Sequence, residues 1–140
     1  MMKVVKVVGA LCIRGDHLLI TRRPSHKSHG GMWEFPGGKV EGGEEHTAAL
    51  RRELQEELAL EVEVGALTHH VVHDYENFVI ELYIYRCQAI GELKLVEVMD
   101  ARWILPSELS TFTLTPADVP VAVDLATRGL PTLTEPTLHL

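Results

Sequence analysis

The residues best able to carry out chemistry lie in one stretch, Gly38 to Leu60, which reads GKVEGGEEHTAALRRELQEELAL. Its glutamates Glu53, Glu56 and Glu57 are three and four positions apart, so they share one face of an α-helix with about 3.6 residues per turn. Like charges at this spacing cost roughly a few tenths of a kcal/mol per pair. Several carboxylates together suit a hard cation such as Mg²⁺ or Mn²⁺. The spacing therefore favours a metal site, and a solvated acidic helix face is the alternative interpretation.

An apolar stripe on the same helix indicates which side is buried. Leu50, Leu54 and Leu58 are four positions apart and share a face beside the one that carries the acids. If the leucines pack against a sheet, the glutamates are left at the edge of a core, where a site is usually built. Gly37 and Gly38 precede the helix, and glycine permits positive φ angles and close approach of the backbone to a ligand.

The stretch resembles the Nudix box, in which Gly, five residues, Glu, seven residues and Arg-Glu-apolar-any-Glu-Glu are followed by any residue, Gly and an apolar residue. The matching positions are Gly38, Glu44, Arg52, Glu53, Leu54, Glu56, Glu57, Ala59 and Leu60. Ala59 alone departs from the pattern. It falls at the helix end, where left-handed geometry is favoured and Ala costs roughly 1 kcal/mol more than Gly. The resemblance implies a Mg²⁺- or Mn²⁺-dependent hydrolase of nucleoside diphosphates linked to another group.

The resemblance also implies roles for individual residues. The metal would be held by the Gly38 carbonyl and by the carboxylates of Glu53, Glu56, Glu57 and Glu97. Glu97 lies six residues before Trp103, as a glutamate does in similar enzymes, and Glu97 or Glu53 would take a proton from water. Arg52 would orient the glutamates, and Glu44 would assist as a further acid of the box. An exposed loop acid is the alternative interpretation of Glu97.

The segment Trp33–Glu41, WEFPGGKVE, and the preceding Thr21–Pro24 are similar to the MutT-like branch of the family. That branch includes enzymes that hydrolyse oxidised nucleoside triphosphates and CTP. The resemblance implies hydrolysis of a nucleoside triphosphate to a monophosphate and pyrophosphate. We expect Arg23 and Lys39 to contact the phosphates, although Arg23 also fits a solvated loop arginine.

Asp118, in the segment Thr115–Pro120, lies where the MutT-like enzymes read the base. An ionised carboxylate there would only accept hydrogen bonds, and it would repel the O6 atom of guanine. Asp118 also fits a helix-capping role after Thr115. Phe35, Tyr75 and Phe78 are candidates for stacking on a base, although strand aromatics more often pack in a core.

Composition limits the remaining possibilities. The 140 residues suit one domain, which we expect to span residues 1–130, with a poorly ordered tail over residues 131–140. The formal charge of −7 argues against a nucleic-acid polymer as partner, but not against a small nucleotide that binds with metal ions. The first apolar run is better explained as a strand than as a signal peptide, and no segment approaches the length of a membrane helix. A cytoplasmic monomer or homodimer is expected.

The pattern of elements predicts an α/β protein. We expect strands at Val4–Ile13, Leu18–Arg22, Trp33–Val40, Glu61–Val72, Phe78–Ile90 and Ala101–Leu105. Helices are expected at Glu45–Leu58 and from Thr115-Pro116 to about Thr127, with a helical turn at Pro106–Leu109. The resemblance implies the Nudix fold, in which a mixed sheet lies between helices in an α/β/α arrangement.

Three other functions remain open on this sequence. The box is shared by Nudix hydrolases of ADP-ribose, nucleotide sugars and dinucleoside polyphosphates. A Nudix module that binds nucleotide without cleaving it would be expected to have lost acids of the box, and none is lost here. A small acidic interaction domain would show no thermal shift with Mg²⁺.

Overall fold

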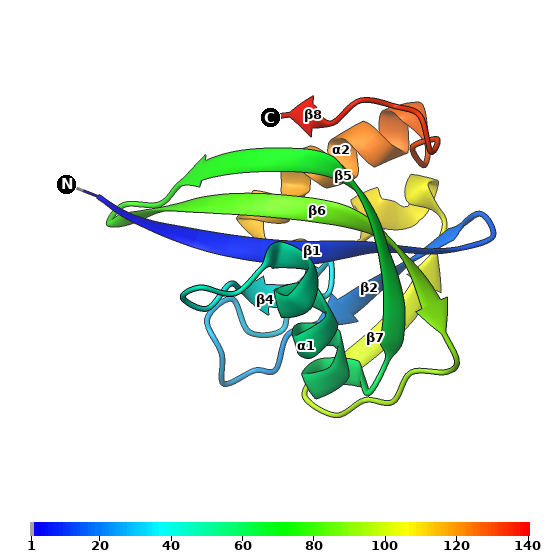
Figure 1. The fold of residues 1–140 in the computed structure, drawn as a ribbon, viewed down its shortest axis with the longest axis horizontal. Coiled ribbons are helices and arrows are strands. Elements are labelled where there is room, and N and C mark those ends of the chain that lie inside the picture. Colours follow the sequence, from blue (N-terminus) through cyan, green and yellow to red (C-terminus); the bar gives the residue numbers. More distant parts are fainter. Residues whose placement is uncertain (1) are drawn as a thin grey trace.

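Strand β1, Lys3–Arg14, pairs with three other strands of a mixed eight-stranded sheet in the computed structural model, which describes residues 2–140 (Figure 1). It is parallel to β6 and antiparallel to β2 and β4. The sheet order is β3-β2-β1-β6-β5-β8, with β4 joined to β1 and β7 joined to β2. The remaining strands are β2 His17–Arg22, β3 Trp33–Glu34, β4 Gly37–Lys39, β5 Glu61–Asp74, β6 Phe78–Ile90, β7 Asp100–Ile104 and β8 Leu138–His139.

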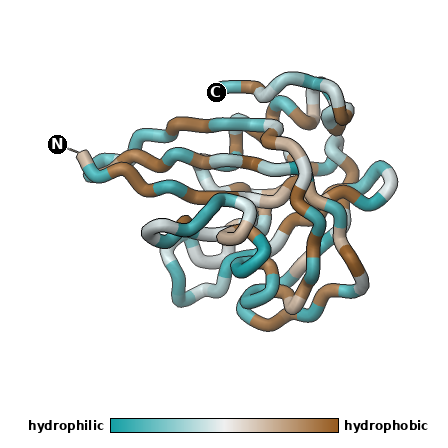
Figure 2. Tube along the Cα trace, in the orientation of Figure 1, coloured by the Kyte–Doolittle hydropathy of each residue, from teal (hydrophilic) through white to brown (hydrophobic). Residues whose placement is uncertain are grey.

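Alternate side chains of β1 enter two hydrophobic cores on opposite faces of the sheet. Val8, Ala10 and Cys12 are fully buried in the cluster that contains the leucine stripe of α1, His46–Leu58. Leu11, which points the other way, is fully buried in the second cluster. Figure 2 shows hydrophobic residues along the strands, whereas much of α1 is hydrophilic. The helix therefore contacts the sheet through a narrow apolar stripe and leaves its acidic face at the edge of the core.

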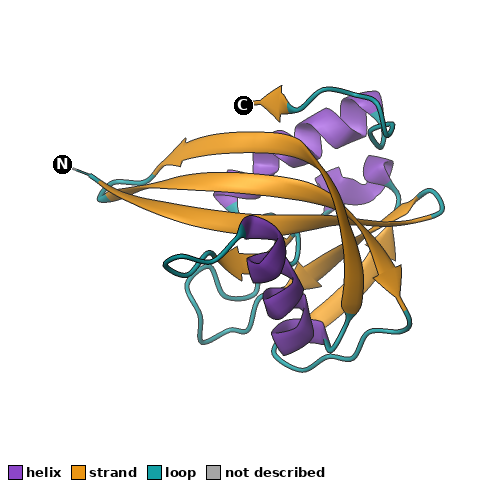
Figure 3. Ribbon diagram, viewed as in Figure 1, coloured by secondary structure: helices purple, strands orange, loops and turns teal. Residues whose placement is uncertain are grey.

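The second core lies under the C-terminal helices. It joins the sheet to helix α2, Val119–Arg128, and to the 3₁₀ turn η1, Pro106–Thr111, through residues such as Leu109, Val121 and Leu125. Figure 3 shows α1 on one side of the sheet and α2 with the short turns on the other. The α/β/α arrangement expected from the sequence is therefore confirmed.

One expected strand is divided in two. The sequence predicted a single extended segment over Trp33–Val40, but Phe35 and Pro36 separate β3, which pairs with β2, from β4, which pairs with β1. Proline has no N–H to donate to a ladder, although its carbonyl accepts a hydrogen bond from the Ala10 N–H at 2.8 Å. The break lets one short segment pair with both β1 and β2, and Phe35 lies between β3 and β4 in the chain.

The helices agree with the sequence to within a few residues. Helix α1 begins one residue later than expected, because Glu45 is its N-cap. The C-terminal helix was expected from Thr115-Pro116, but a 3₁₀ turn, η2, occupies Pro116–Asp118 and the α-helix follows from Val119. Asp118 therefore lies at the junction of two helical segments.

The C-terminal segment differs from its expectation of poor order. Residues Leu138 and His139 form β8, which runs parallel to β5 beside His69 and His70. The Leu140 N–H donates to the His70 carbonyl at 2.8 Å, and the Val72 N–H donates to the Leu140 carbonyl at 3.1 Å. Composition could not indicate this, because a strand of two residues forms only where another part of the chain offers an open sheet edge.

No helix among residues 2–140 is both long enough and apolar enough to cross a membrane.

Candidate functional site

A cavity of about 660 Å³ lies beside the acidic face of α1, within the usual range for sites that bind small molecules. At one end its lining includes Gly37, Gly38 and Glu53. At the other end it includes all four residues expected to contact a base, Phe35, Tyr75, Phe78 and Asp118. Basic side chains also contribute, namely Lys3, Arg23, Lys27 and Lys39. The cavity thus has an acidic end, an aromatic end and cations along its walls.

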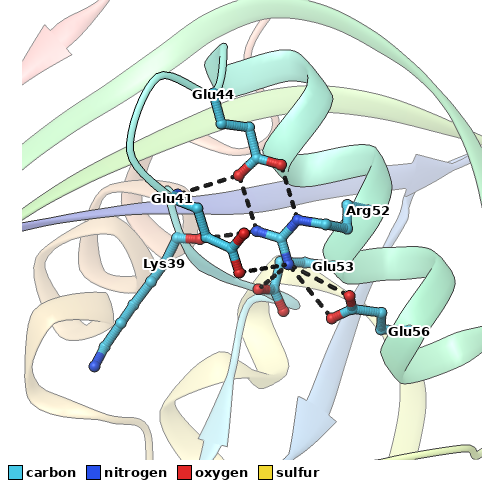
Figure 4. Close-up of polar contacts among 6 residues, drawn as sticks. All are labelled: Lys39, Glu41, Glu44, Arg52, Glu53 and Glu56. Atoms are coloured by element: carbon cyan, nitrogen blue, oxygen red, sulfur yellow. Dashed lines mark hydrogen bonds and ion pairs between the residues drawn. The ribbon is translucent and has the colours of Figure 1, made fainter.

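The guanidinium of Arg52 lies at the centre of the acid cluster (Figure 4). It binds Glu44 through two parallel hydrogen bonds, Nε to Oε2 at 2.8 Å and Nη2 to Oε1 at 2.9 Å. Such a paired contact fixes both side chains in one geometry. The hydrogen bond from Arg52 is the main reason that the pKa of Glu44 is lowered. Glu44 also accepts from the Glu41 N–H, so it joins the loop before α1 to the helix.

The same guanidinium contacts the metal-binding candidates. Its Nη1 donates to Glu53 at 3.0 Å and approaches Glu56 at 3.4 Å, and its Nη2 donates to the Lys39 carbonyl at 3.1 Å. Across residues 2–140 no three acidic, histidine or cysteine side chains converge on a ready metal position. In this arrangement Arg52 supplies the positive charge that lies next to Glu53 and Glu56.

Glu57 differs from the other acids of the box because Arg52 does not contact it. Its side chain is buried, and within residues 2–140 its Oε2 atom has no hydrogen-bond partner. Burial raises the pKa of Glu57 to about 8, and the negative charges of Glu34 and Glu53 add to that effect. A buried carboxylate oxygen without a partner is costly unless a cation or another donor approaches it. The donor set of Glu57 with Glu53 and Glu56 is made of oxygens, which fits Mg²⁺ or Mn²⁺.

Gly37 and Gly38, where the box begins, permit a close contact that no other residue would allow. A Cβ atom on Gly38 would lie 2.4 Å from the carboxyl carbon of Glu53. A Cβ atom on Gly37 would lie 1.9 Å from the Val8 carbonyl oxygen, on the neighbouring strand β1. Strand β4 can therefore lie close both to β1 and to the Glu53 carboxylate. This places the Gly38 backbone beside the acids, as the sequence predicted, although its role as a ligand stays a prediction.

Glu97 lies on the loop between β6 and β7, next to the end of α1. Its N–H and that of Val96 both donate to the Glu57 carbonyl, at 3.1 and 3.0 Å. The backbone of this loop is thus attached to the last turn of the helix that carries the box. The Glu97 side chain is exposed, and it is not among the residues that line the cavity. Its role as a ligand or base stays a prediction.

The aromatic end of the cavity is formed by the tip of the β5–β6 hairpin and by η2. The rings of Tyr75 and Phe78 stack with their centroids 4.9 Å apart and their planes at 18°, and both residues are partly exposed. Phe35 is buried, and its backbone N–H donates to the Asp118 carboxylate at 3.0 Å. Tyr75 and Phe78 can therefore offer a ring to a ligand, while Phe35 packs into the core and orients Asp118.

Asp118 differs from the ionised residue considered from the sequence. It is buried, and burial, with the negative charge of Glu34, raises the pKa of Asp118 to about 8. A carboxyl group whose pKa is raised in this way takes up a proton more readily, and its protonated form can donate as well as accept a hydrogen bond. Thr115 and Asp118 are the N-cap residues of η2 and α2, as the capping interpretation expected for Thr115, but neither side chain makes a capping hydrogen bond, and the Asp118 carboxylate accepts from the Phe35 N–H instead.

The sequence did not single out two charged residues of the cavity, Glu34 and Lys27. Glu34 is bound by Arg23 and has a pKa raised by burial, which Arg23 opposes. Lys27 lies in the loop between β2 and β3 and lines the cavity. Lys27 is the one lysine of that loop, and this was the available clue, but its distance from the acids depends on how the loop folds.

Comparisons with known proteins agree on one family. A family model described as NUDIX domain matches residues 7–122. The chain is 36% identical over 121 residues to a CTP pyrophosphohydrolase of Escherichia coli (strain K12), covering 86% of this chain and 90% of that protein. It is 38% identical over 128 residues to a putative 8-oxo-dGTP diphosphatase 2 of Mycobacterium tuberculosis, covering 90% of each. The solution structure of the E. coli ORF135 protein matches with a TM-score of 0.79 and 34% identity, over 93% of this chain and 96% of that one.

Proposed function

The chain belongs to the Nudix family of hydrolases, and from that premise we propose that it hydrolyses nucleoside triphosphates to a nucleoside monophosphate and pyrophosphate, with Mg²⁺ or Mn²⁺ as cofactor. One observation carries the proposal. The Glu57 carboxyl group, whose Oε2 atom has no hydrogen-bond partner among residues 2–140, belongs to the same helix as Glu53, which lines the acidic end of the cavity with Gly38, and stacked aromatic rings lie at the other end. A nucleotide has the matching parts, an aromatic base and a charged phosphate chain that binds with a cation.

The residues of the acidic end would hold the cation and prepare water for attack. Gly38, Glu53, Glu56 and Glu57 are the proposed ligands, with Glu97 joining from its loop. When bound, the cation supplies neutralisation of the phosphate charge and increases the acidity of water. Glu53 or Glu97 would take the proton of the attacking water. Arg52 supports the proposal by holding Glu44, Glu53 and Glu56 in fixed positions.

The relatives and the aromatic end together favour a triphosphate whose base enters the cavity. Relatives bear the names CTP pyrophosphohydrolase and 8-oxo-dGTP diphosphatase. In its protonated form Asp118 offers a donor and an acceptor to a base edge, and Tyr75 and Phe78 offer stacking worth roughly 1–3 kcal/mol per base. Arg23 and Lys39 both line the cavity, and contacts from them to the phosphates stay the prediction made from the sequence. We expect the reaction to take place in the cytoplasm, on a monomer or homodimer.

The experiment that tests the proposal combines a substrate panel with one substitution. The protein with Mg²⁺ would be incubated with CTP, dCTP, dGTP, 8-oxo-dGTP, ADP-ribose and a dinucleoside polyphosphate, and products would be identified by mass spectrometry. We expect monophosphate and pyrophosphate from a triphosphate. Glu57→Gln should reduce turnover by roughly a hundredfold or more, since loss even of groups that only support a metal ligand costs up to that much.

Glu63→Gln is the matched control, because Glu63 is an exposed acid on β5 that does not line the cavity. It should turn over substrate as the wild type does. Cleavage of ADP-ribose or the dinucleotide alone would replace the substrate class while keeping the site. Near-normal turnover by Glu57→Gln would contradict the proposed metal site, and nucleotide binding without turnover would favour a non-catalytic module.

A further inference from the structure

We propose that Lys27 binds the terminal phosphates of the nucleotide, those released as pyrophosphate, and that Arg23 serves to position the loop that carries it. This assignment rests on the proposed function of the same site, and it concerns a residue outside the Nudix box. It also changes the interpretation of Arg23, which the sequence favoured as a phosphate contact.

The first step is that the guanidinium of Arg23 is already bound within the protein. Its Nε donates to the Ser28 carbonyl at 2.7 Å, and its Nη1 donates to both carboxylate oxygens of Glu34 at 3.1 Å. Its Nη2 approaches the Ser28 hydroxyl at 3.4 Å. All three nitrogens of the group therefore have partners. These contacts hold the loop to β3 and take up most of the five N–H donors of the group.

The second step is that the loop between β2 and β3 is built as a compact turn around Lys27. The Lys27 N–H donates to the Pro24 carbonyl at 3.2 Å, and the Gly31 N–H returns to the Arg23 carbonyl at 2.9 Å. Gly30 lies so close to the facing backbone that a Cβ atom there would be 2.4 Å from the Ser25 carbonyl oxygen. The loop therefore holds the Lys27 backbone in place beside the cavity that its side chain lines.

The third step is that the ammonium group of Lys27 is free to meet a ligand. Its side chain is exposed, and across residues 2–140 it forms no ion pair and donates no side-chain hydrogen bond. Its charge nevertheless acts on the acidic end of the cavity. Burial raises the pKa of Glu34, Glu53 and Glu57, and the positive charge of Lys27 opposes that rise at all three carboxyls.

The fourth step distinguishes Lys27 from the other cations of the cavity. Lys27 lines the same cavity as Glu53 and Gly38 and has no side-chain partner among residues 2–140, whereas Arg23 is held by Ser28 and Glu34. The Lys39 side chain extends away from the carboxylates around Arg52 (Figure 4). With the base at the aromatic end, the phosphates nearest the acidic end are the terminal ones. Lysine binds phosphate as a point charge, and it needs no fixed fork geometry.

The experiment measures pyrophosphate binding directly, so it does not depend on turnover or on the identity of the base. Isothermal titration of inorganic pyrophosphate, in Mg²⁺, would be carried out on the wild type, Lys27→Met, Lys27→Arg and Lys6→Met. Lys6 is the matched control, because it is an exposed lysine of β1 outside the cavity lining. The inhibition constant of the nucleoside monophosphate product would be measured beside it.

We expect Lys27→Met to raise the dissociation constant of pyrophosphate roughly tenfold or more, as loss of a charged hydrogen bond does. Lys27→Arg should retain at least half of the pyrophosphate-binding free energy that Lys27→Met loses. Lys6→Met should bind pyrophosphate as the wild type does. The inhibition constant of the monophosphate should change less than about twofold in all variants. Equal weakening of both ligands by Lys27→Met would overturn the assignment to the terminal phosphates. Unchanged pyrophosphate binding, or none by the wild type, would overturn it altogether.

Failure of the wild type to hydrolyse any triphosphate, with intact and Lys27-dependent pyrophosphate binding, would count against the proposed function and not against this assignment. Because the Lys27 side chain is exposed and makes no hydrogen bond or ion pair among residues 2–140, thermal melting of Lys27→Met should match the wild type. A melting temperature lower by several degrees would show that Lys27 supports the fold. Lys27→Arg would then decide whether binding needs the positive charge or the aliphatic part of the lysine side chain.

Discussion

The guanidinium group of Arg52 offsets the negative charge of several glutamates in and beside the Nudix box. Arg52 lies within 4 Å of carboxylates from Glu41, Glu44, Glu53 and Glu56, which would otherwise repel one another. It leaves Glu57, the most buried of the box acids, without such a contact. The arginine thus fixes the surrounding acids and does not neutralise the one best placed to attract a metal ion.

At the residue scale, we predict that Arg52→Gln damages the site through the glutamates it holds. Turnover should fall roughly tenfold to a hundredfold, and the Mg²⁺ concentration for half-maximal activity should rise, since groups that orient metal ligands contribute factors of that size. Steady-state rates over a Mg²⁺ titration give both values. Arg51→Gln, a change to an exposed neighbour that does not line the cavity, should leave them unchanged. An unaltered Mg²⁺ requirement in Arg52→Gln would argue that the acids are held by other contacts.

At the element scale, the end of helix α1 shows a cost that the sequence predicted. Ala59 is in the left-handed region, with φ 48° and ψ 37°. Its N–H donates to the Gln55 carbonyl at 3.0 Å, and the Leu60 N–H donates to the Leu54 carbonyl at 3.3 Å. These two bonds turn the chain from the helix into β5. A side chain with a Cβ atom is held there against its preference because the turn is required.

We predict that Ala59→Gly stabilises the protein. The substitution removes the strain of a left-handed alanine, worth roughly 1 kcal/mol, and should raise the melting temperature by about 4 °C. Ala48→Gly, at an exposed position within the same helix, should lower the melting temperature instead, because glycine costs about 1 kcal/mol there. Differential scanning calorimetry of both variants provides the comparison. A lower melting temperature for Ala59→Gly would mean that the alanine methyl group contributes packing that exceeds the strain.

The elements also show what the sequence could and could not reveal. Helix α1 was predictable because its leucines and glutamates follow the helical period over several turns. The break at Phe35-Pro36 was not, because segments of two or three residues have too little pattern. The bond between Asp118 and the Phe35 N–H joins residues 83 positions apart, and no local pattern contains it. Lys27 was overlooked for the same reason, since its nearness to the acids follows from the folded loop.

At the scale of the whole molecule, the C-terminal segment closes an open edge of the sheet. Thr137 donates from its hydroxyl to the Leu67 carbonyl at 2.9 Å, and β8 then continues along β5. Beneath it, buried His69 contacts Asp124 of α2 at 2.8 Å. Strand β5 is thereby tied to the C-terminal segment on its edge and to α2 on its face.

We predict that removal of residues 137–140 lowers stability while leaving the catalytic site intact. Three hydrogen bonds to β5, each worth about 1 kcal/mol net, would be lost, so the melting temperature should fall by several degrees. KM should change little, because none of these residues lines the cavity. Thr134→Ala, an exposed change earlier in the same segment, is the control. An unchanged melt after truncation would show that β8 adds no stability to the sheet edge.

The two ends of the cavity are assembled from different parts of the chain, and this has a consequence for how specificity can be altered. The acidic end depends on β4 and α1, where Gly37 and Gly38 admit no side chain, whereas the aromatic end depends on the β5–β6 hairpin tip and η2. Tyr75 and Phe78 can therefore be substituted without disturbing the box. A combinatorial library confined to these two positions would search base preference on a constant catalytic scaffold. Recombining this hairpin tip with that of a relative should transfer selectivity as a separable module.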